Sequence, residues 1–171
     1  MSGLATFFDM AFSFKGRLRR RDYWGMSIVL VVVQLNLTRI VLTNLYAGGT
    51  NPEGALSTPL ALVIAETVLA LPFAWSNFAM INKRFHDQDK SSKWGITAWA
   101  VCILPLWVMP FFEVLLVGEL YSLTLLTIVL LLLTFPAFLY VLVIAGFLNG
   151  TPGPNRFGPS PKAKEFAKVS E

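Results

Sequence analysis

The sequence has little of the chemistry on which most enzymes and metalloproteins depend. It holds one histidine, His86, and one cysteine, Cys102. Zinc sites take three or four protein ligands, most of them Cys and His, and a disulfide joins two cysteines. This chain has too few of both. No nucleophile stands beside His86 in a recognisable motif, so we expect no enzymatic activity, no bound metal and no cofactor.

Charged residues are also scarce, and most of the chain consists of long apolar runs. Charged residues make up 14% of the 171 residues and hydrophobic residues 55%, with a mean hydropathy of +0.61. Apolar runs occupy residues 23–46, 59–81, 94–117 and 121–148. Each is long enough to cross a hydrocarbon layer of ~30 Å, which takes ~20 helical residues. The sequence therefore predicts an all-α integral membrane protein, with a bundle of four transmembrane helices over residues 23–148.

The basic residues are placed unevenly along the chain. Of its 14 Lys and Arg residues, 13 lie before the first run, between the second and third, or after the fourth. The connections after the first and third runs have none, and hold Glu53 and Glu119 instead. Cytoplasmic loops next to spans carry the excess of Lys and Arg, so we expect both termini and the middle loop to be cytoplasmic. Basic residues at span ends favour the bilayer and its anionic headgroups as partners, and not nucleic acid.

The two ends of the chain are predicted to be cytoplasmic segments of different kinds. Residues 1–22 begin with apolar side chains at helical spacing and continue into a basic cluster. The apolar positions are Leu4, Phe7, Phe8, Ala11 and Phe12. This pattern is typical of an amphipathic helix lying in the membrane interface. Residues 149–171 form a tail whose first part is rich in Pro and Gly, which favours turns over helix.

Three ionisable residues, Arg39, Glu66 and Glu113, lie inside the apolar runs. Each costs roughly 2.5–3.5 kcal/mol at mid-membrane. Arg39 precedes the outer end of the first run by as many residues as Glu66 follows the outer start of the second, so both lie ~10 Å below the outer boundary. Their matched depth predicts an Arg39–Glu66 ion pair, which Glu113 could join. Two interpretations stay open: a structural pair, or a polar cavity used by a small transporter or channel subunit.

Three polar motifs adjoin the runs on the predicted cytoplasmic side. The first run is preceded by GRLRRRDYW (16–24), the second is followed by KRFHD (83–87), and the fourth by NGTPGPNRFGPSP (149–161). In order and position they resemble the DUF805 family of small bacterial inner-membrane proteins of unknown function, whose motifs look like GRxxRxxYW, RLHD and PGxxGPNRYGxxP. The resemblance covers nearly the whole chain. It implies a location in the bacterial inner (plasma) membrane and leaves the activity open.

The chain departs from the family's pattern in the middle loop. The family usually runs DxGxSGW there, whereas QDKSSKW follows Asp87 in this sequence. Both glycines are absent. The tight turn that glycine permits must be built in another way, for which Asp89 or Ser92 is the candidate because such side chains support turns.

All three motifs emerge at one end of the predicted bundle, so their polar side chains can converge at headgroup depth. The candidate ligand-binding residues are Arg17, Arg20, Arg84, His86, Asp87, Asn155 and Arg156. Guanidinium forks bind phosphate oxygens through paired hydrogen bonds. This predicts a binding or accessory protein that engages an anionic headgroup or a partner protein.

The alternative is that these residues only fasten the loop and tail to the bundle, while Arg19, Arg20 and Arg21 set topology. A partner membrane protein, or a second copy of this chain, could also pack against the spans. The leucine-rich fourth run is as suited to such a contact as to lipid.

Overall fold

The computed structural model describes residues 3–48, 58–117 and 124–161. Within these ranges every regular element is a helix: α1 (Gly3–Phe12), α2 (Arg20–Gly48), α3 (Thr58–Asp87), α4 (Lys93–Val117) and α5 (Thr124–Val141), which continues as the π-helix η1 (Leu142–Phe147). Four of these helices, α5 being counted together with η1, are long and apolar enough to cross a membrane. The predicted all-α class is confirmed, and so is the prediction of four helices with the length and hydropathy to span a membrane.

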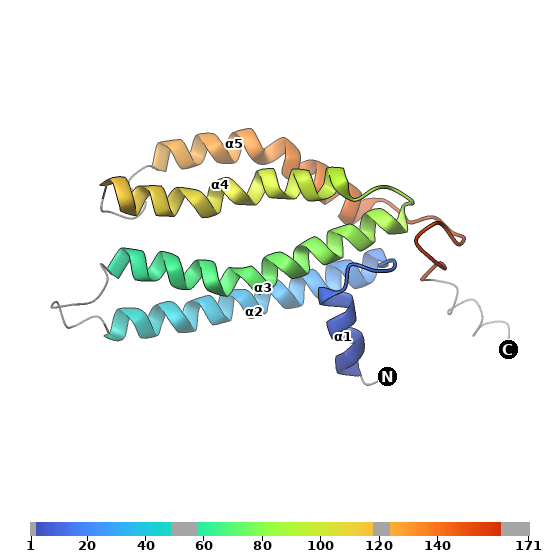
Figure 1. Ribbon diagram of the computed structural model, residues 1–171, viewed down its shortest axis with the longest axis horizontal. Coiled ribbons are helices and arrows are strands. Elements are labelled where there is room, and N and C mark those ends of the chain that lie inside the picture. The colour runs from blue at the N-terminus through green and yellow to red at the C-terminus, as the bar shows by residue number, and fades with distance from the viewer. Residues whose placement is uncertain (1–2, 49–57, 118–123, 162–171) are drawn as a thin grey trace.

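The four long helices form two antiparallel pairs (Figure 1). α2 packs against α3, α3 against α4, and α4 against α5. The pairs meet where α2 begins and α3 ends, and there η1 contacts both helices. Toward the other end, the α2–α3 pair and the α4–α5 pair separate (Figure 1). We call the meeting end, where residues 16–24, 83–87 and 149–161 lie, the basic end.

Apolar side chains cover the outside of the long helices. On α2 the side chains of Ile28, Val31 and Leu35 are more than half exposed, and on α5 Leu132 and Leu133 are too. A helix that presents apolar residues all round is stable when its surroundings are apolar. The outer surface of the bundle is therefore suited to hydrocarbon as its solvent.

The tightest packing lies at the basic end. The largest fully buried side chains are all in residues 76–85 of α3, and they are Arg84, Phe85, Met80, Ile81 and Ser76. Phe85 also packs so close to Gly95 that a Cβ at residue 95 would overlap its ring. The missing side chain thus brings the start of α4 against the end of α3. This end fixes the relative positions of the helices.

α1 is the amphipathic helix predicted from residues 4–12, and it extends sideways from the α2–α3 pair (Figure 1). Ala11 is fully buried, whereas Phe8 is 57% exposed. The Lys83 Nζ of α3 donates to the carbonyl oxygens of Asp9 at 2.7 Å and Met10 at 2.8 Å. A cation is favourable there, because the last carbonyls of a helix lack donors and carry partial negative charge.

α3 continues six residues beyond the span end predicted at Ile81 and reaches Asp87. Hydropathy predicts a loop for residues 82–87, which are polar except for Phe85. This stretch stays helical because its side chains find partners inside the protein, as Asn82 Nδ2 does with Phe14 O at 2.7 Å. The loop to α4 is correspondingly short, spanning residues 88–92.

Asp89 takes the place of the family's glycine in the turn that ends α3. Its φ is 56°, in the left-handed region that glycine adopts most easily. Lys90 N donates to Phe85 O at 2.9 Å and Asp89 N donates to His86 O at 3.1 Å. This pair of hydrogen bonds is the Schellman ending of a helix. Of the two residues proposed from the sequence, Asp89 occupies the position with the special backbone conformation.

Candidate functional site

Asp87, the last residue of α3, is the centre of the polar contacts at the basic end. Arg17 Nε donates to its Oδ1 at 3.0 Å, and Arg84 Nη1 donates to its Oδ2 at 2.9 Å. The side chains of Arg17, Arg84 and Asp87 are 1%, 0% and 7% exposed. Charge-assisted hydrogen bonds shielded from water are strong, and removing one partner leaves a buried charge. We call these three residues the arginine anchor.

Arg84 fastens the end of the fourth span to α3. Its Nε donates to Ala145 O at 2.7 Å and its Nη2 to Leu148 O at 2.7 Å. Its Nη1 also reaches Leu18 O at 3.1 Å, just before α2. A single side chain therefore joins the segments that begin the first span, end the second and end the fourth.

Other side chains take the neighbouring carbonyls of η1. Gln88 Nε2 donates to the carbonyl of residue 144 at 2.6 Å, Trp24 Nε1 to that of residue 146 at 2.9 Å, and Arg20 Nη1 to that of residue 147 at 3.1 Å. With the two that Arg84 holds, five consecutive carbonyls accept from side chains. These side-chain donors therefore stabilise the π-helical winding. At an ordinary α-helix end, the last carbonyls have no donors from the helix itself.

Arg17 fastens the tail to the end of α3. Its Nη1 donates to Gly153 O at 2.7 Å, and its Nη2 donates to Thr151 O at 2.7 Å. Thr151 N in turn donates to Asp87 O at 2.8 Å. Gly150 lies so close that a Cβ at this residue would overlap the Asp87 carboxylate. Glycine at this position is a requirement of the close approach between tail and anchor.

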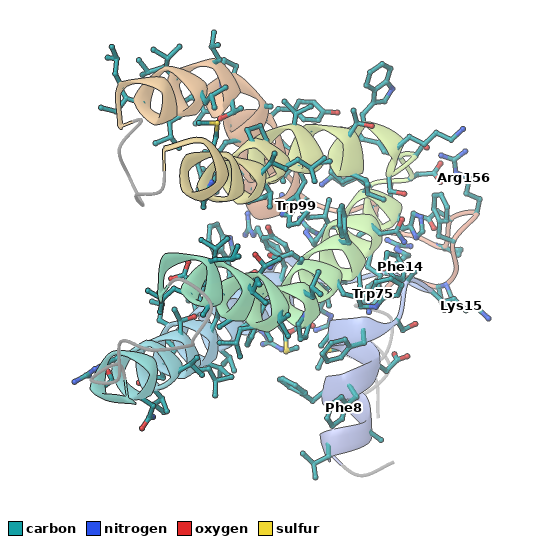
Figure 2. The ribbon with its side chains drawn as sticks, turned by 60° about the vertical axis from the view of Figure 1, so that its left-hand side comes forward. Phe8, Phe14, Lys15, Trp75, Trp99 and Arg156 are labelled. Carbon is teal, nitrogen blue, oxygen red and sulfur yellow. The ribbon has the colours of Figure 1, made fainter. Side chains whose placement is uncertain are left out.

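The rest of the tail folds back over the end of α3. Asn155 Nδ2 donates to His86 O at 2.8 Å, and the His86 ring stacks on Phe157 with 3.7 Å between centroids. Arg156 pairs with Asp89 at 3.2 Å, with both side chains about half exposed. Figure 2 shows Arg156 on the outer edge of this end, away from the bundle. Loop and tail therefore meet, as the sequence predicts.

All seven candidate ligand-binding residues lie at the basic end, but their donors differ in availability. Every guanidinium nitrogen of Arg17 and Arg84 donates to a protein oxygen. Neither residue presents a fork to a ligand in this arrangement. The geometry matches the alternative in which they fasten loop and tail to the bundle. The ligand-binding role of Arg17 and Arg84 stays a prediction.

A cleft of about 330 Å³ opens beside the anchor. Its walls come from the start of α2, the end of α3 and two parts of the tail, and they consist of Arg19, Arg20, Arg21, Asp87, Asn149, Gly150, Thr151, Pro152, Ser160 and Pro161. Three consecutive arginines thus face the Pro- and Gly-rich segment across an open space. We call this space the basic cleft.

Two of the three cleft arginines keep most of their donors. Arg20 uses Nη1 for the carbonyl of residue 147, and its Nε and Nη2 have no acceptor among the described residues. Arg21 has an 81% exposed side chain with only a 3.5 Å contact to Asp22. Arg19 differs, because its Nε donates to Pro161 O at 2.9 Å and so closes one wall. Arg20 is one of the candidate ligand-binding residues predicted from the sequence, whereas Arg19 and Arg21 are predicted there only to set topology. The structure brings Arg21 to the same cleft.

The predicted intramembrane ion pair is absent from the described part of the structure. Arg39 is exposed and forms no ion pair with the half-buried Glu66, although both side chains are described. Equal depth does not by itself bring two side chains together, because successive residues of a helix are rotated by about 100°. Thr38, one residue earlier, is the one that faces Glu66 across a second cleft. Glu113 belongs to α4, but its side chain lies outside the described residues.

Comparison with known proteins places the chain among membrane proteins. The model of the family described as "Protein of unknown function (DUF805)" matches residues 11–159. "Inner membrane protein YhaH" of Escherichia coli (strain K12) is 28% identical over 151 residues, which cover 87% of each chain. The protein of the same name from Escherichia coli O157:H7 gives the same values. No solved structure matches the chain.

Proposed function

We propose that this chain, which belongs to the DUF805 family of membrane proteins of unknown function, is an accessory protein that binds an anionic headgroup through its phosphate. The binding site in this proposal is the basic cleft. The observation that carries the proposal is that Arg20 and Arg21 border an open cleft with unused guanidinium donors. Such forks match the geometry of phosphate oxygens and bind them in pairs.

The proposal includes the orientation and the membrane. The basic end carries the connections rich in Lys and Arg, which favours the cytoplasmic side for both termini. The similar protein of Escherichia coli is named an inner membrane protein, which supports the bacterial inner membrane for this chain. The basic cleft would then lie among the headgroups of the cytoplasmic leaflet, whose anionic lipids attract basic side chains.

The charges around the basic cleft favour an anion. Asp87 is the acidic residue of its lining, but both of its carboxylate oxygens accept from arginines of the anchor. The arginine anchor has two positive guanidinium groups and one negative carboxylate. Its net charge is therefore positive, and it adds positive charge beside the basic cleft. The volume of about 330 Å³ falls at the small end of the ~300–1,000 Å³ typical of ligand pockets. A headgroup fits that scale better than a whole lipid.

The arginine anchor has a positioning role in this proposal. By holding Thr151 and Gly153, Arg17 keeps the tail wall in place before any ligand arrives. A site whose walls are fixed in advance loses less entropy on binding. The proposed activity is binding and not catalysis, because both carboxylate oxygens of Asp87, the acidic residue of the lining, already accept from arginines.

The test is isothermal titration of the purified full chain with short-chain phospholipids. Dihexanoyl phosphatidylglycerol should bind, and dihexanoyl phosphatidylcholine should bind weakly or not at all. Replacing Arg20 and Arg21 together by glutamine should weaken binding by about 10- to 100-fold, the range for losing hydrogen bonds to a charged group. Replacing both by lysine should recover only part of the affinity, since lysine lacks the planar fork.

Lys15→Gln is the matched control, because Lys15 is an exposed cation of the same end that does not line the basic cleft. Figure 2 shows Lys15 beside the chain that links α1 to α2. This variant should bind like the parent. Equal losses in the control and the arginine variants would mean simple electrostatic adhesion and would overturn the proposal. Inorganic phosphate binding as tightly as the lipid would instead identify free phosphate as the ligand.

A further inference from the structure

A second cleft, of about 270 Å³, lies between α2, α3 and α4 at a different place in the bundle. Its polar side chains are Gln34, Thr38, Glu66 and Thr67. We call it the span cleft. Its lining comes from the middle of α2, the first half of α3 and the second half of α4, which are helices long and apolar enough to cross a membrane.

Glu66 is the charged residue of this lining, and it has no visible counter-charge. The residue is half-buried, and no described side chain forms an ion pair or hydrogen bond with its carboxylate. Arg39, the cation at similar depth, is exposed on another face of α2. A carboxylate within a span is costly unless it is paired or neutralised. The span cleft therefore offers an acid that lacks a partner within the described protein.

The other polar groups of the span cleft also have hydrogen-bonding capacity left. Gln34 and Thr38 form no hydrogen bond with another described residue. The Thr67 hydroxyl donates to Val63 O at 2.8 Å, which leaves its oxygen able to accept. An amide oxygen and two hydroxyl oxygens thus line the same cleft as the carboxylate, and all of them can accept from a donor with several N–H groups.

We propose that the span cleft binds a small organic cation, an ammonium group with a short apolar body. The ammonium would donate to Glu66 and to the neighbouring oxygens. The apolar body would pack on the remaining walls, which are Leu35, Val63, Ala70 and Pro110. None of the described residues that line the cleft is basic, which argues against an anion.

An inorganic cation fits the same cleft less well. Dedicated sites for hard cations take six or more oxygens at short distance, and the volume of about 270 Å³ is much larger than a bare ion needs. Half of the lining residues are apolar, which an ion would not use. A lipid chain alone would leave the Glu66 carboxylate without a partner. An organic ammonium can donate hydrogen bonds to the polar residues of the lining and pack its apolar body against the apolar ones.

The inference goes beyond the proposed headgroup site and does not depend on it. The span cleft and the basic cleft share no residue. They also require ligands of opposite charge. Loss of binding in one therefore leaves the other to be measured in the same preparation.

The experiment is isothermal titration of the full chain in zwitterionic nanodiscs with butylammonium chloride. Sodium chloride and 1-butanol, at the same concentrations, probe the charge and the apolar body separately. Only butylammonium should give saturable binding. Glu66→Gln should weaken that binding by about 10- to 100-fold, because it removes a charge-assisted hydrogen bond with little change of shape.

Two further variants keep the test decisive if Glu66→Gln folds poorly. Thr38→Val should weaken butylammonium binding by about 2- to 10-fold, as expected for one neutral hydrogen bond. Arg39→Gln should bind no more weakly than the parent, because Arg39 faces away from the span cleft. Equal binding of sodium or of butanol would overturn the proposal, and so would full affinity in both Glu66→Gln and Thr38→Val.

Discussion

Replacing Asp87 by asparagine should release the tail from the bundle while the spans stay folded. Asparagine keeps the shape of the side chain but has no charge, and its amide can turn an N–H toward a guanidinium group that also only donates. Arg17 and Arg84 would then be two buried cations without a counter-charge. Their side chains are 1% and 0% exposed, so water cannot replace the lost carboxylate without opening the site.

The magnitude follows from the burial of the anchor. Removing one partner of a buried ion pair typically costs 3–5 kcal/mol. While the tail is docked, both arginines of this variant keep their hydrogen bonds to backbone carbonyls, so we expect the lower end, about 3 kcal/mol. That value raises the population of the detached tail by roughly 100-fold, since each 1.4 kcal/mol is a factor of about ten.

The assay is limited trypsin digestion of the purified protein, followed by mass spectrometry of the tail fragments. In the parent, the bond after Arg156 should be cut slowly, and in Asp87→Asn it should be cut much faster. Asp89→Asn is the control, because the Arg156–Asp89 pair is 58% and 47% exposed and such pairs contribute only about 0–1 kcal/mol. An Asp87→Asn protein that is digested like this control would refute the account of the anchor.

Three further predictions concern the turns and the topology. Gly150→Ala should detach the tail as strongly as loss of the anchor carboxylate, because its Cβ would overlap that group, whereas Gly153→Ala meets nothing within 4 Å and should be digested like the parent. Asp89→Ala should unfold at lower temperature than Asp89→Gly by the equivalent of about 1 kcal/mol, because alanine is strained at the left-handed φ of 56° and glycine is not. In intact cells of a strain expressing the chain, an impermeant thiol reagent should label cysteine placed at Gly48 and not at Ser91; the reverse pattern would overturn the proposed orientation.

Hydropathy was sufficient to predict the spans, since any helix that crosses hydrocarbon must be apolar over most of its length. The end of α3 could not be found in this way. Residues 82–87 are polar except for Phe85, and their polar side chains are satisfied by partners from distant parts of the chain, as Asn82 is by Phe14. Such partners become visible only once the chain is folded.

The convergence of the three motifs could be predicted from topology, but the use of each arginine could not. Arg84 donates to the carbonyl of Ala145 in η1 and to that of Leu148 just after it, and nothing in the sequence indicates a π-helix at the end of the fourth span. Arg39 shows a second limit. Its depth was estimated from residue counts, yet its direction depends on the helix rotation, and a difference of one residue separates it from the cleft that Thr38 lines.

The most direct test of the headgroup proposal is native mass spectrometry of the protein extracted from bacterial membranes with no lipid added. The parent should retain an anionic phospholipid, and the variant with Arg20 and Arg21 replaced by glutamine should lose it. Lys15→Gln should retain the lipid like the parent. A parent that carries only zwitterionic lipid, or an arginine variant that retains the anionic lipid in full, would contradict the assignment of the basic cleft as a headgroup site.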